Sequence, residues 1–372
     1  MAIETVFILG AGASHAEGAP LQKDLFAAYH RGLTEPESTG DKTDPEIATF
    51  FRTFFGIDFS CSHPNKPYPT FEDALGIIEI ALKRGESFPG FDLAPPNPRL
   101  QWMREHLVNL IANMLGNIGR GGAPHHQKLV NSLHKQGSLL RTGFISLNYD
   151  TFIDGALDLP DIDLDYGVEF GKLVAKGWRG KGLTARWRKP RPARSVPLYK
   201  LHGSLNWLYC SRCTALIMLP KRFPLVVPIE NNCPCGGTSL APIIVPPTFF
   251  KLMSNVQLQQ IWRHAERALL SARRIVFCGY SLPDADLHVK YLLKRAELNR
   301  RGTQPEVYIV NDHNGKTCVD LKGEMDRYLR LWRDPGLLHF KKLSFESLCE
   351  SWPNILSDAP ERRHSRRMNH LC

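Results

Sequence analysis

The chain has 372 residues, more than a single hydrophobic core usually holds, so one large domain with insertions or two domains are expected. Hydrophobic residues make up 43% and charged residues 23%, proportions typical of soluble globular proteins. No run of 18 apolar residues and no signal-type segment occurs, so we expect neither a membrane protein nor a secreted one, and a cytoplasmic location.

The net charge of +10 comes largely from one segment. Nine Lys or Arg residues and no acidic residue lie between Lys172 and Arg194, with Trp178 and Trp187 among them. Cations interleaved with aromatic rings are typical of sites for single-stranded nucleic acid or phosphate, so nucleic acid is a candidate partner of residues 172–194. A solvated loop or a subunit contact explains the same composition, and we favour that interpretation.

Five short apolar runs have the character of strands, and each is followed by Gly, His or Asn. In chain order they are Thr5–Leu9 before Gly10, Gly143–Leu147 before Asn148, Val196–Leu201 before His202, Arg274–Cys278 before Gly279, and Val307–Val310 before Asn311. Nearly continuous apolar runs suit a parallel sheet that is buried on both faces. Ligands bind outside the carboxyl ends of such strands, so the five strand ends predict one shared site.

Segments with apolar residues at helical spacing separate these strands. Thr70 and Asp73 have the spacing of a capping box, which predicts the start of a helix through Ala74–Lys83. Further helices are expected over Leu100–Asn117, Asn255–Leu270 and Asp286–Glu297. Strands that alternate with helices indicate a doubly wound parallel sheet.

Four of the nine cysteines form a cluster in the sequence: Cys210, Cys213, Cys233 and Cys235. Two pairs, C-x₂-C and C-x-C, supply four thiolates for tetrahedral zinc, although the second pair is one residue shorter than usual. Four unrelated free thiols are the alternative. A closed four-thiolate site leaves no position for water, so this zinc is expected to be structural.

The predicted fold class is α/β: a Rossmann-like doubly wound parallel sheet with a helical insertion and a small zinc-ribbon module. The expected division is a Rossmann-like domain from residues 1–30, 126–205 and 241–345, a helical insertion at 31–125, a zinc-ribbon module at 206–240 and a C-terminal tail at 346–372. No internal repeat is evident.

The first strand leads directly into Gly10-Ala11-Gly12-Ala13-Ser14. Small residues let the backbone approach a pyrophosphate, and a helix that starts there presents N–H donors to it. The pattern departs from G-x-G-x-x-G because His15 holds the last position, and no acidic residue ends a strand soon after. Nucleotide binding is therefore expected and hydride transfer is not, with a plain tight turn as the alternative.

The other strand ends carry Asn148-Tyr149-Asp150, His202-Gly203-Ser204, Gly279-Tyr280-Ser281 and Asn311. Asn and Asp after a strand often begin a turn or cap a helix, and a single histidine often has a structural role. Each motif alone is therefore weak evidence for a site.

Taken in order, these motifs resemble the sirtuin family, in its divergent bacterial defence-associated branch. The resemblance covers roughly residues 5–315 without the insertions. It implies that NAD binds at the sheet edge, with Gly10, Ala11, Gly12 and Ser14 at the pyrophosphate, Gly279 and Ser281 at phosphate or ribose, and Asn311 at the adenosine ribose. It also implies that Asn148 and Asp150 line the nicotinamide pocket and that His202 is the base.

The chain lacks the G-I-P-D-F-R and Q-N-I-D elements of the deacylases and reads Gly18-Ala19-Pro20-Leu21-Gln22 and Leu147-Asn148-Tyr149-Asp150 instead. It thus resembles members that hydrolyse NAD to nicotinamide and ADP-ribose, an activity used in antiphage defence. An NAD-dependent lysine deacylase and a non-catalytic NAD or ADP-ribose sensor remain alternatives. An unregulated NAD hydrolase is toxic, so control by homo-oligomerisation or by a partner, such as an ATPase or an Argonaute-type protein, is expected.

Overall fold

A computed structural model describes most of the chain. The described residues are 2–34, 44–59, 66–93, 98–119, 121–171, 173–176, 182–185, 187–219, 230–237, 240–244, 255–312 and 317–354. Within them, no helix is both long and apolar enough to cross a membrane.

The centre of the protein is a seven-stranded sheet in which every pair of neighbouring strands is parallel. Its order is β14 (Leu338–Lys342), β13 (Glu306–Asn311), β12 (Arg274–Cys278), β1 (Thr5–Leu9), β2 (Thr142–Ser146), β7 (Ser195–Lys200) and β3 (Asp163–Asp165). All five predicted strands are present, and β3 and β14 extend the two edges. The predicted α/β fold class with a doubly wound parallel sheet is confirmed.

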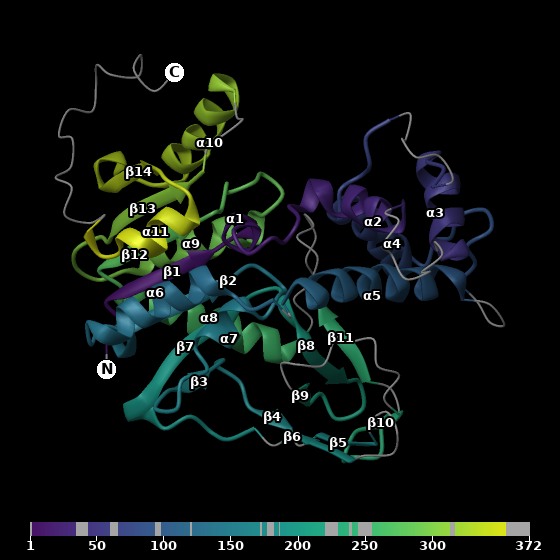
Figure 1. Ribbon diagram of the computed structural model, residues 1–372, viewed down its shortest axis with the longest axis horizontal. Helices are drawn as coiled ribbons and strands as arrows, with labels where there is room; N and C mark the ends of the chain where they lie inside the picture. Colours follow the sequence, from purple (N-terminus) through teal and green to yellow (C-terminus); the bar gives the residue numbers. More distant parts are fainter. Residues whose placement is uncertain are drawn as a thin grey trace.

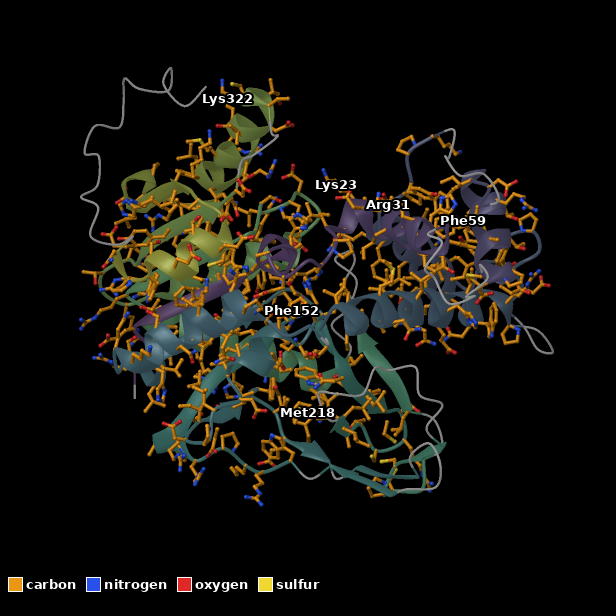
Figure 2. All side chains as sticks on the ribbon, in the orientation of Figure 1. Lys23, Arg31, Phe59, Phe152, Met218 and Lys322 are labelled. Atoms are coloured by element: carbon orange, nitrogen blue, oxygen red, sulfur yellow. The ribbon has the colours of Figure 1, made fainter. Side chains whose placement is uncertain are left out.

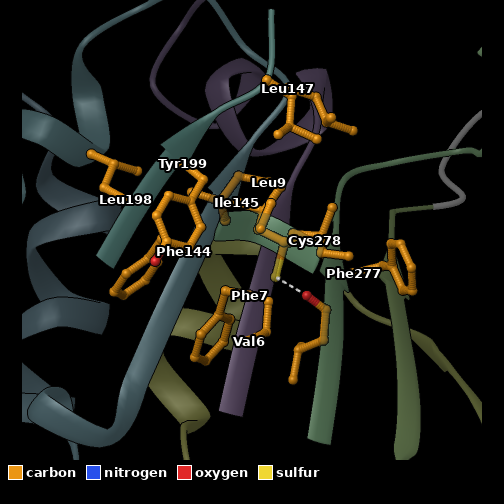
Figure 3. Packing of buried hydrophobic residues seen from close by; sticks show 14 of the residues in the cluster. Val6, Phe7, Leu9, Phe144, Ile145, Leu147, Leu198, Tyr199, Phe277 and Cys278 are labelled. Atoms are coloured by element: carbon orange, nitrogen blue, oxygen red, sulfur yellow. Dashed lines mark hydrogen bonds between the residues drawn. The ribbon is translucent and has the colours of Figure 1, made fainter. Parts of the chain in front are cut away.

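The sheet is buried on both faces, as continuous apolar runs require. Phe7 of β1 stacks on Phe144 of β2 with ring centroids 5.6 Å apart, and both rings are fully buried. Figure 3 shows these rings among the side chains of neighbouring strands, including Leu198 and Phe277. The core therefore fixes the strands that carry the motifs.

Helices cover the sheet in two groups. In the first, α6 (Pro124–Lys135) packs on α7 (Phe152–Ala156) and on α11 (Phe345–Ser351). In the second, α8 (Val256–Ser271) packs on α9 (Leu287–Asn299). Strand order runs outward in both directions from β1, and right-handed crossovers then place the two groups on opposite faces. Figure 1 shows α6 and α11 together on the near face.

The predicted start of the C-terminal tail at residue 346 is wrong. Residues Phe345–Ser351 form α11, and Leu348 and Cys349 are buried against the core. Trp352 is also buried and meets Phe7 edge to face at 4.9 Å. The apolar residues of this segment have helical spacing, so the chain covers the sheet as far as Trp352. Residues 355–372 of the predicted tail lie outside the described residues.

A helical unit lies between β1 and β2 along the chain. It contains α2 (Leu25–Thr34), α3 (Pro45–Phe55), α4 (Phe71–Arg84) and α5 (Arg99–Gly119). The predicted capping box of Thr70 and Asp73 begins α4. The unit has its own core, rich in phenylalanine, which includes Phe26, Phe51 and Phe71. In Figure 2, Phe59 lies inside this unit and Phe152 lies where the unit meets the sheet domain.

The strands of two small sheets lie between β3 and β12 along the chain. The four-stranded sheet has the order β11 (Leu240–Ile244), β8 (Gly203–Cys210), β9 (Leu216–Met218) and β4 (Phe170–Gly171). The three-stranded sheet has the order β10 (Glu230–Asn232), β5 (Leu173–Lys176) and β6 (Gly182–Ala185). The four-stranded sheet reaches beyond the predicted module at 206–240, because β8 starts directly after His202.

Glycines bring the loops after β1 and β12 into backbone contact, where the strand order reverses. The short helix α1 (Ala11–His15) follows Gly10, and Gly12 N–H donates to Gly279 O over 2.9 Å. Gly279 has φ +61°, and a Cβ atom there would lie 2.4 Å from the nitrogen of Ala13. Packing alone therefore requires glycine at positions 10, 12 and 279.

Replacement of Gly279 by alanine tests this contact. Gly137 is a matched control, because its φ of +64° is nearly the same and a Cβ atom there would meet nothing within 4 Å. Both variants carry the cost of a left-handed alanine, about 1–2 kcal/mol. We expect Gly279→Ala to lose a further 1–3 kcal/mol or so of unfolding free energy through overpacking, measured by urea denaturation. Equal losses in the two variants would contradict the proposed contact.

Candidate functional site

The predicted site residues meet at the carboxyl edge of the large sheet. Asn148 lies just beyond β2, and its half-buried side chain reaches the loop after β1. His202 lies just beyond β7 and contacts the loop after β2. Gly279 lies against the loop after β1. The predicted convergence of strand ends is therefore observed for the motifs of β1, β2, β7 and β12.

A chain of hydrogen bonds joins the first motif to the second. Asn148 donates from Nδ2 to Gly10 O over 2.8 Å and to Ser14 Oγ over 2.7 Å. Ser14 in turn donates to Asp150 Oδ2 over 2.6 Å. The other carboxylate oxygen of Asp150 accepts from Phe152 N over 3.1 Å, at the start of α7. Both amide hydrogens of Asn148 are thus used, and its Oδ1 is the atom that can receive a ligand's hydrogen.

His202 is 2% exposed, and its tautomer follows from one contact. Its Nδ1 lies 3.0 Å from Leu147 O. A carbonyl oxygen only accepts, so Nδ1 carries the proton, and in the neutral ring Nε2 carries the lone pair. This is the arrangement that a histidine general base needs.

A buried cluster that the motifs did not indicate supports the second motif. Lys200 Nζ lies 3.1 Å from Asp154 Oδ2 and also donates to Asp150 O. Tyr166 donates to Asp154 Oδ1 over 2.7 Å. Burial, with Asp154 nearby, raises the pKa of Tyr166 well above its ordinary value, so its hydroxyl stays a donor. The sequence does contain a sign of this cluster, because Lys200 is a charged residue within the otherwise apolar run Val196–Leu201.

Asn311, at the end of β13, is 4% exposed. Its Nδ2 donates to Tyr280 O over 2.9 Å and to the buried carboxylate of Glu324 on α10 (Cys318–Leu331). Its Oδ1 has no hydrogen-bond partner among the described residues. A buried acceptor without a partner is costly, so this atom suits a ligand donor such as a hydroxyl.

The loop after β12 is held in an unusual conformation. Leu282 has φ +51° although it is not glycine, and it is fully buried. Tyr280 donates to Asp286 Oδ2 over 2.7 Å, and Ser281 O accepts from Arg327 over 3.0 Å. Positive φ in a buried leucine indicates that surrounding contacts determine this loop, as is common near binding sites.

The helical unit buries the tyrosine of the second motif. Tyr149 is 7% exposed and belongs to the core of the helical unit. Burial raises its pKa well above the ordinary value, and the carboxylates of Glu72 on α4 and Asp286 add to this. The site is therefore built by the sheet on one side and by the helical unit on the other.

Glu17 fixes the end of the first loop from within the protein. Its Oε1 accepts from the backbone N–H groups of His125 and His126 and lies 2.8 Å from His126 Nδ1. These N–H groups belong to the first turn of α6, whose own N-cap Ala123 makes no side-chain bond. Burial disfavours the charge of Glu17, but hydrogen bonds from His126 outweigh it and hold its pKa below the ordinary value.

The four predicted zinc ligands form one cluster. The sulfur atoms of Cys210, Cys213, Cys233 and Cys235 all lie within 4.8 Å of one another, and none is in a disulfide. Cys210 and Cys235 sulfurs are 3.7 Å apart, and those of Cys213 and Cys233 are 3.5 Å apart. Tetrahedral zinc with bonds of about 2.3 Å requires a sulfur separation of roughly 3.8 Å, so the cluster fits zinc.

The described part of the basic segment is engaged within the protein. Arg191 donates to both carboxylate oxygens of Asp163, over 2.7 and 2.9 Å, and holds the pKa of Asp163 well below its usual range. Arg194 donates to the carbonyl oxygens of Pro160 and Asp161. The side chains of residues 172–186 lie outside the described part of the chain, so binding of nucleic acid there stays a prediction.

Metal analysis tests the cysteine cluster. We expect about one zinc ion per chain in protein purified without chelator, because four clustered thiolates bind zinc tightly. The variant Cys213→Ser/Cys235→Ser should lose the metal and unfold at lower temperature. Cys318→Ser, an exposed cysteine on α10, is the control that should keep it. A wild type without zinc, measured by mass spectrometry of the metal, would refute the assignment.

Comparison with protein families identifies a known domain in this chain. The family model described as a SIR2-like domain matches residues 142–335, which is more than half of the chain. A search of curated proteins found no match by sequence.

A comparison with solved structures found Sir2 proteins among its matches, at low similarity. The crystal structure of a Sir2 homolog–NAD complex has 13% identity and a TM-score of 0.41, and the match covers 94% of this chain and 88% of that one. A Sir2–p53 peptide–NAD⁺ structure has 15% identity and a TM-score of 0.36, with 96% and 94% covered. At such low identity the family model is the decisive finding. On that match, this chain belongs to the family of proteins with a SIR2-like domain.

Proposed function

We propose that the protein binds NAD at the carboxyl edge of the sheet and hydrolyses the bond between nicotinamide and ribose. The observation that carries this proposal is the hydrogen-bonded union of three strand ends. Asn148, just beyond β2, is tied to Gly10 and Ser14 beyond β1, and His202, just beyond β7, is tied to the loop after β2 through Leu147 O. A base and an orienting amide are thus both tied to the loop after β2, whose strand lies next to β1 at the topological switch point.

The arrangement suits a dinucleotide. We propose that Gly10, Ala11, Gly12 and Ser14 face the pyrophosphate, although the N–H groups of Gly10 and Gly12 already donate to Cys278 O and Gly279 O. These two N–H groups therefore do not bind the phosphates. The small residues contribute by letting the pyrophosphate approach the backbone closely.

The remaining binding residues come from the strand ends on the other side of β1. Gly279 and Ser281 are assigned to phosphate or ribose. The buried Oδ1 of Asn311 is assigned to a hydroxyl of the adenosine ribose, because it lacks a partner among the described residues and is held in place by Glu324.

The chemistry follows from the charge of the substrate. Nicotinamide in NAD is a pyridinium, so it leaves with the bonding electron pair as a neutral molecule and needs no acid. A water oxygen forms the new bond to the ribose carbon while Nε2 of His202 takes its proton. Oδ1 of Asn148 orients the water or the nicotinamide amide. Asp150 keeps Asn148 in this orientation through Ser14, because both its carboxylate oxygens are engaged.

The biological setting is proposed from the resemblance to the defence-associated branch. Hydrolysis would deplete NAD in the cytoplasm during antiphage defence. Its control is assigned to homo-oligomerisation or to an ATPase or Argonaute-type partner, since uncontrolled loss of NAD is harmful to the cell.

Incubation of purified protein with NAD alone tests the activity. We expect nicotinamide and ADP-ribose in equal amounts, measured by chromatography. His202→Asn retains a donor for Leu147 O but lacks a base, so turnover should fall by at least about 10²-fold. Asn148→Ala should also be inactive. Ser271→Ala is the control, because this serine at the end of α8 donates to Ala268 O and has no assigned role in the reaction.

The outcomes separate the alternatives. Release of nicotinamide only when an acyl-lysine peptide is present would replace hydrolysis by deacylation. A thermal shift with NAD or ADP-ribose but without product, with or without candidate partners, would indicate a sensor. Full activity of His202→Asn would refute its role as base.

A further inference from the structure

We infer that the buried ion pair of Lys200 and Asp154 is a clamp that positions residues 147–151, the N-Y-D loop, and through it Asn148. The inference rests on the proposed function, because it assigns a positioning residue to the same site. Lys200 contacts Asp150 at its backbone oxygen and not at its carboxylate, so it acts through the backbone of this loop.

Each backbone carbonyl group from Ser146 to Asp150 accepts a hydrogen bond. Leu201 N–H donates to Ser146 O, and His202 Nδ1 donates to Leu147 O. Leu205 N–H donates to Tyr149 O over 2.9 Å, and Lys200 Nζ donates to Asp150 O. Four of the five carbonyls from Ser146 to Asp150 therefore accept hydrogen bonds from residues 200–205. The fifth, Asn148 O, accepts from Ser146 Oγ.

Lys200 and His202 act together on the loop after β2. Lys200 ends β7, His202 follows in the turn directly after it, and both side chains contact this loop. One binds the carbonyl before Asn148 and the other the carbonyl after Tyr149. The segment that carries Asn148 is therefore held at both ends, by Lys200 at the end of β7 and by His202 in the turn that follows.

The energetic cost of the pair indicates a purpose beyond stability. The side chains of Lys200 and Asp154 are fully buried. Buried ion pairs often stabilise a protein no more than apolar residues of the same size, because both charges lose their water. A charged donor does, however, make a stronger and more directed hydrogen bond to a carbonyl than a neutral one. Asp154 neutralises the lysine that makes this bond.

The test removes both charges together and takes from Asp150 O the donor whose role is in question. Lys200→Met/Asp154→Leu is made in a Tyr166→Phe background, because Tyr166 would otherwise lose its acceptor. Tyr166→Phe alone is the matched control, since it perturbs the same cluster without touching Asp150 O. If the triple variant does not fold, the double variant Lys200→Met/Asp154→Asn is used in its place, because its asparagine keeps an acceptor for Tyr166.

We expect the folded variant to exchange the amide hydrogens of residues 146–156 faster than the control, measured by mass spectrometry. With NAD, kcat should fall about 10²-fold, the loss expected from a misplaced catalytic group, while KM changes little. The pH profile should be unchanged, because the pair removed is neutral overall.

Exchange and kcat equal to those of the control would overturn the clamp, and so would a shifted pH profile, which would indicate an electrostatic role. If the wild type does not cleave NAD, the proposed function fails. The exchange measurement then decides independently whether Lys200 orders the loop.

Discussion

The close contact between Gly12 and Gly279 is the constraint on which the site depends. Parallel strands on either side of the switch point diverge after their last residues, so their loops meet only if the backbones can touch. Glycine permits this, with Gly12 N–H donating to Gly279 O. Once the loops after β1 and β12 meet, Gly10 O is held where Asn148 of β2 can reach it over 2.8 Å.

From that contact the polar groups follow as a connected set. Asn148, Ser14 and Asp150 form one line of hydrogen bonds, and every hydrogen in it has a defined direction. His202 and Lys200 then bind the carbonyls on either side of Asn148 and Tyr149. Such a network leaves few alternative positions for Asn148, which is the preorganisation that a reacting site requires.

The remaining modules support the site from outside. The helical unit buries Tyr149 and Phe152, on either side of Asp150, in its own core. The cysteine cluster includes the last residue of β8, Cys210, and β8 begins directly after His202. A zinc ion with these four sulfur ligands would have no open position, so it would hold structure and take no part in the reaction.

The sequence by itself determined the parallel sheet, because buried strands need continuous apolar runs, and it located the motifs, because polar residues end those runs. It also showed the four cysteines and the capping box at Thr70, which are local patterns. Tertiary structure alone decided the rest. Glu17 caps α6 from more than 100 residues away, Lys200 finds its partners in the loop after β2, and α11 covers Phe7. Such contacts depend on which strands become neighbours in the sheet, and local residue spacing does not predict the order of the strands.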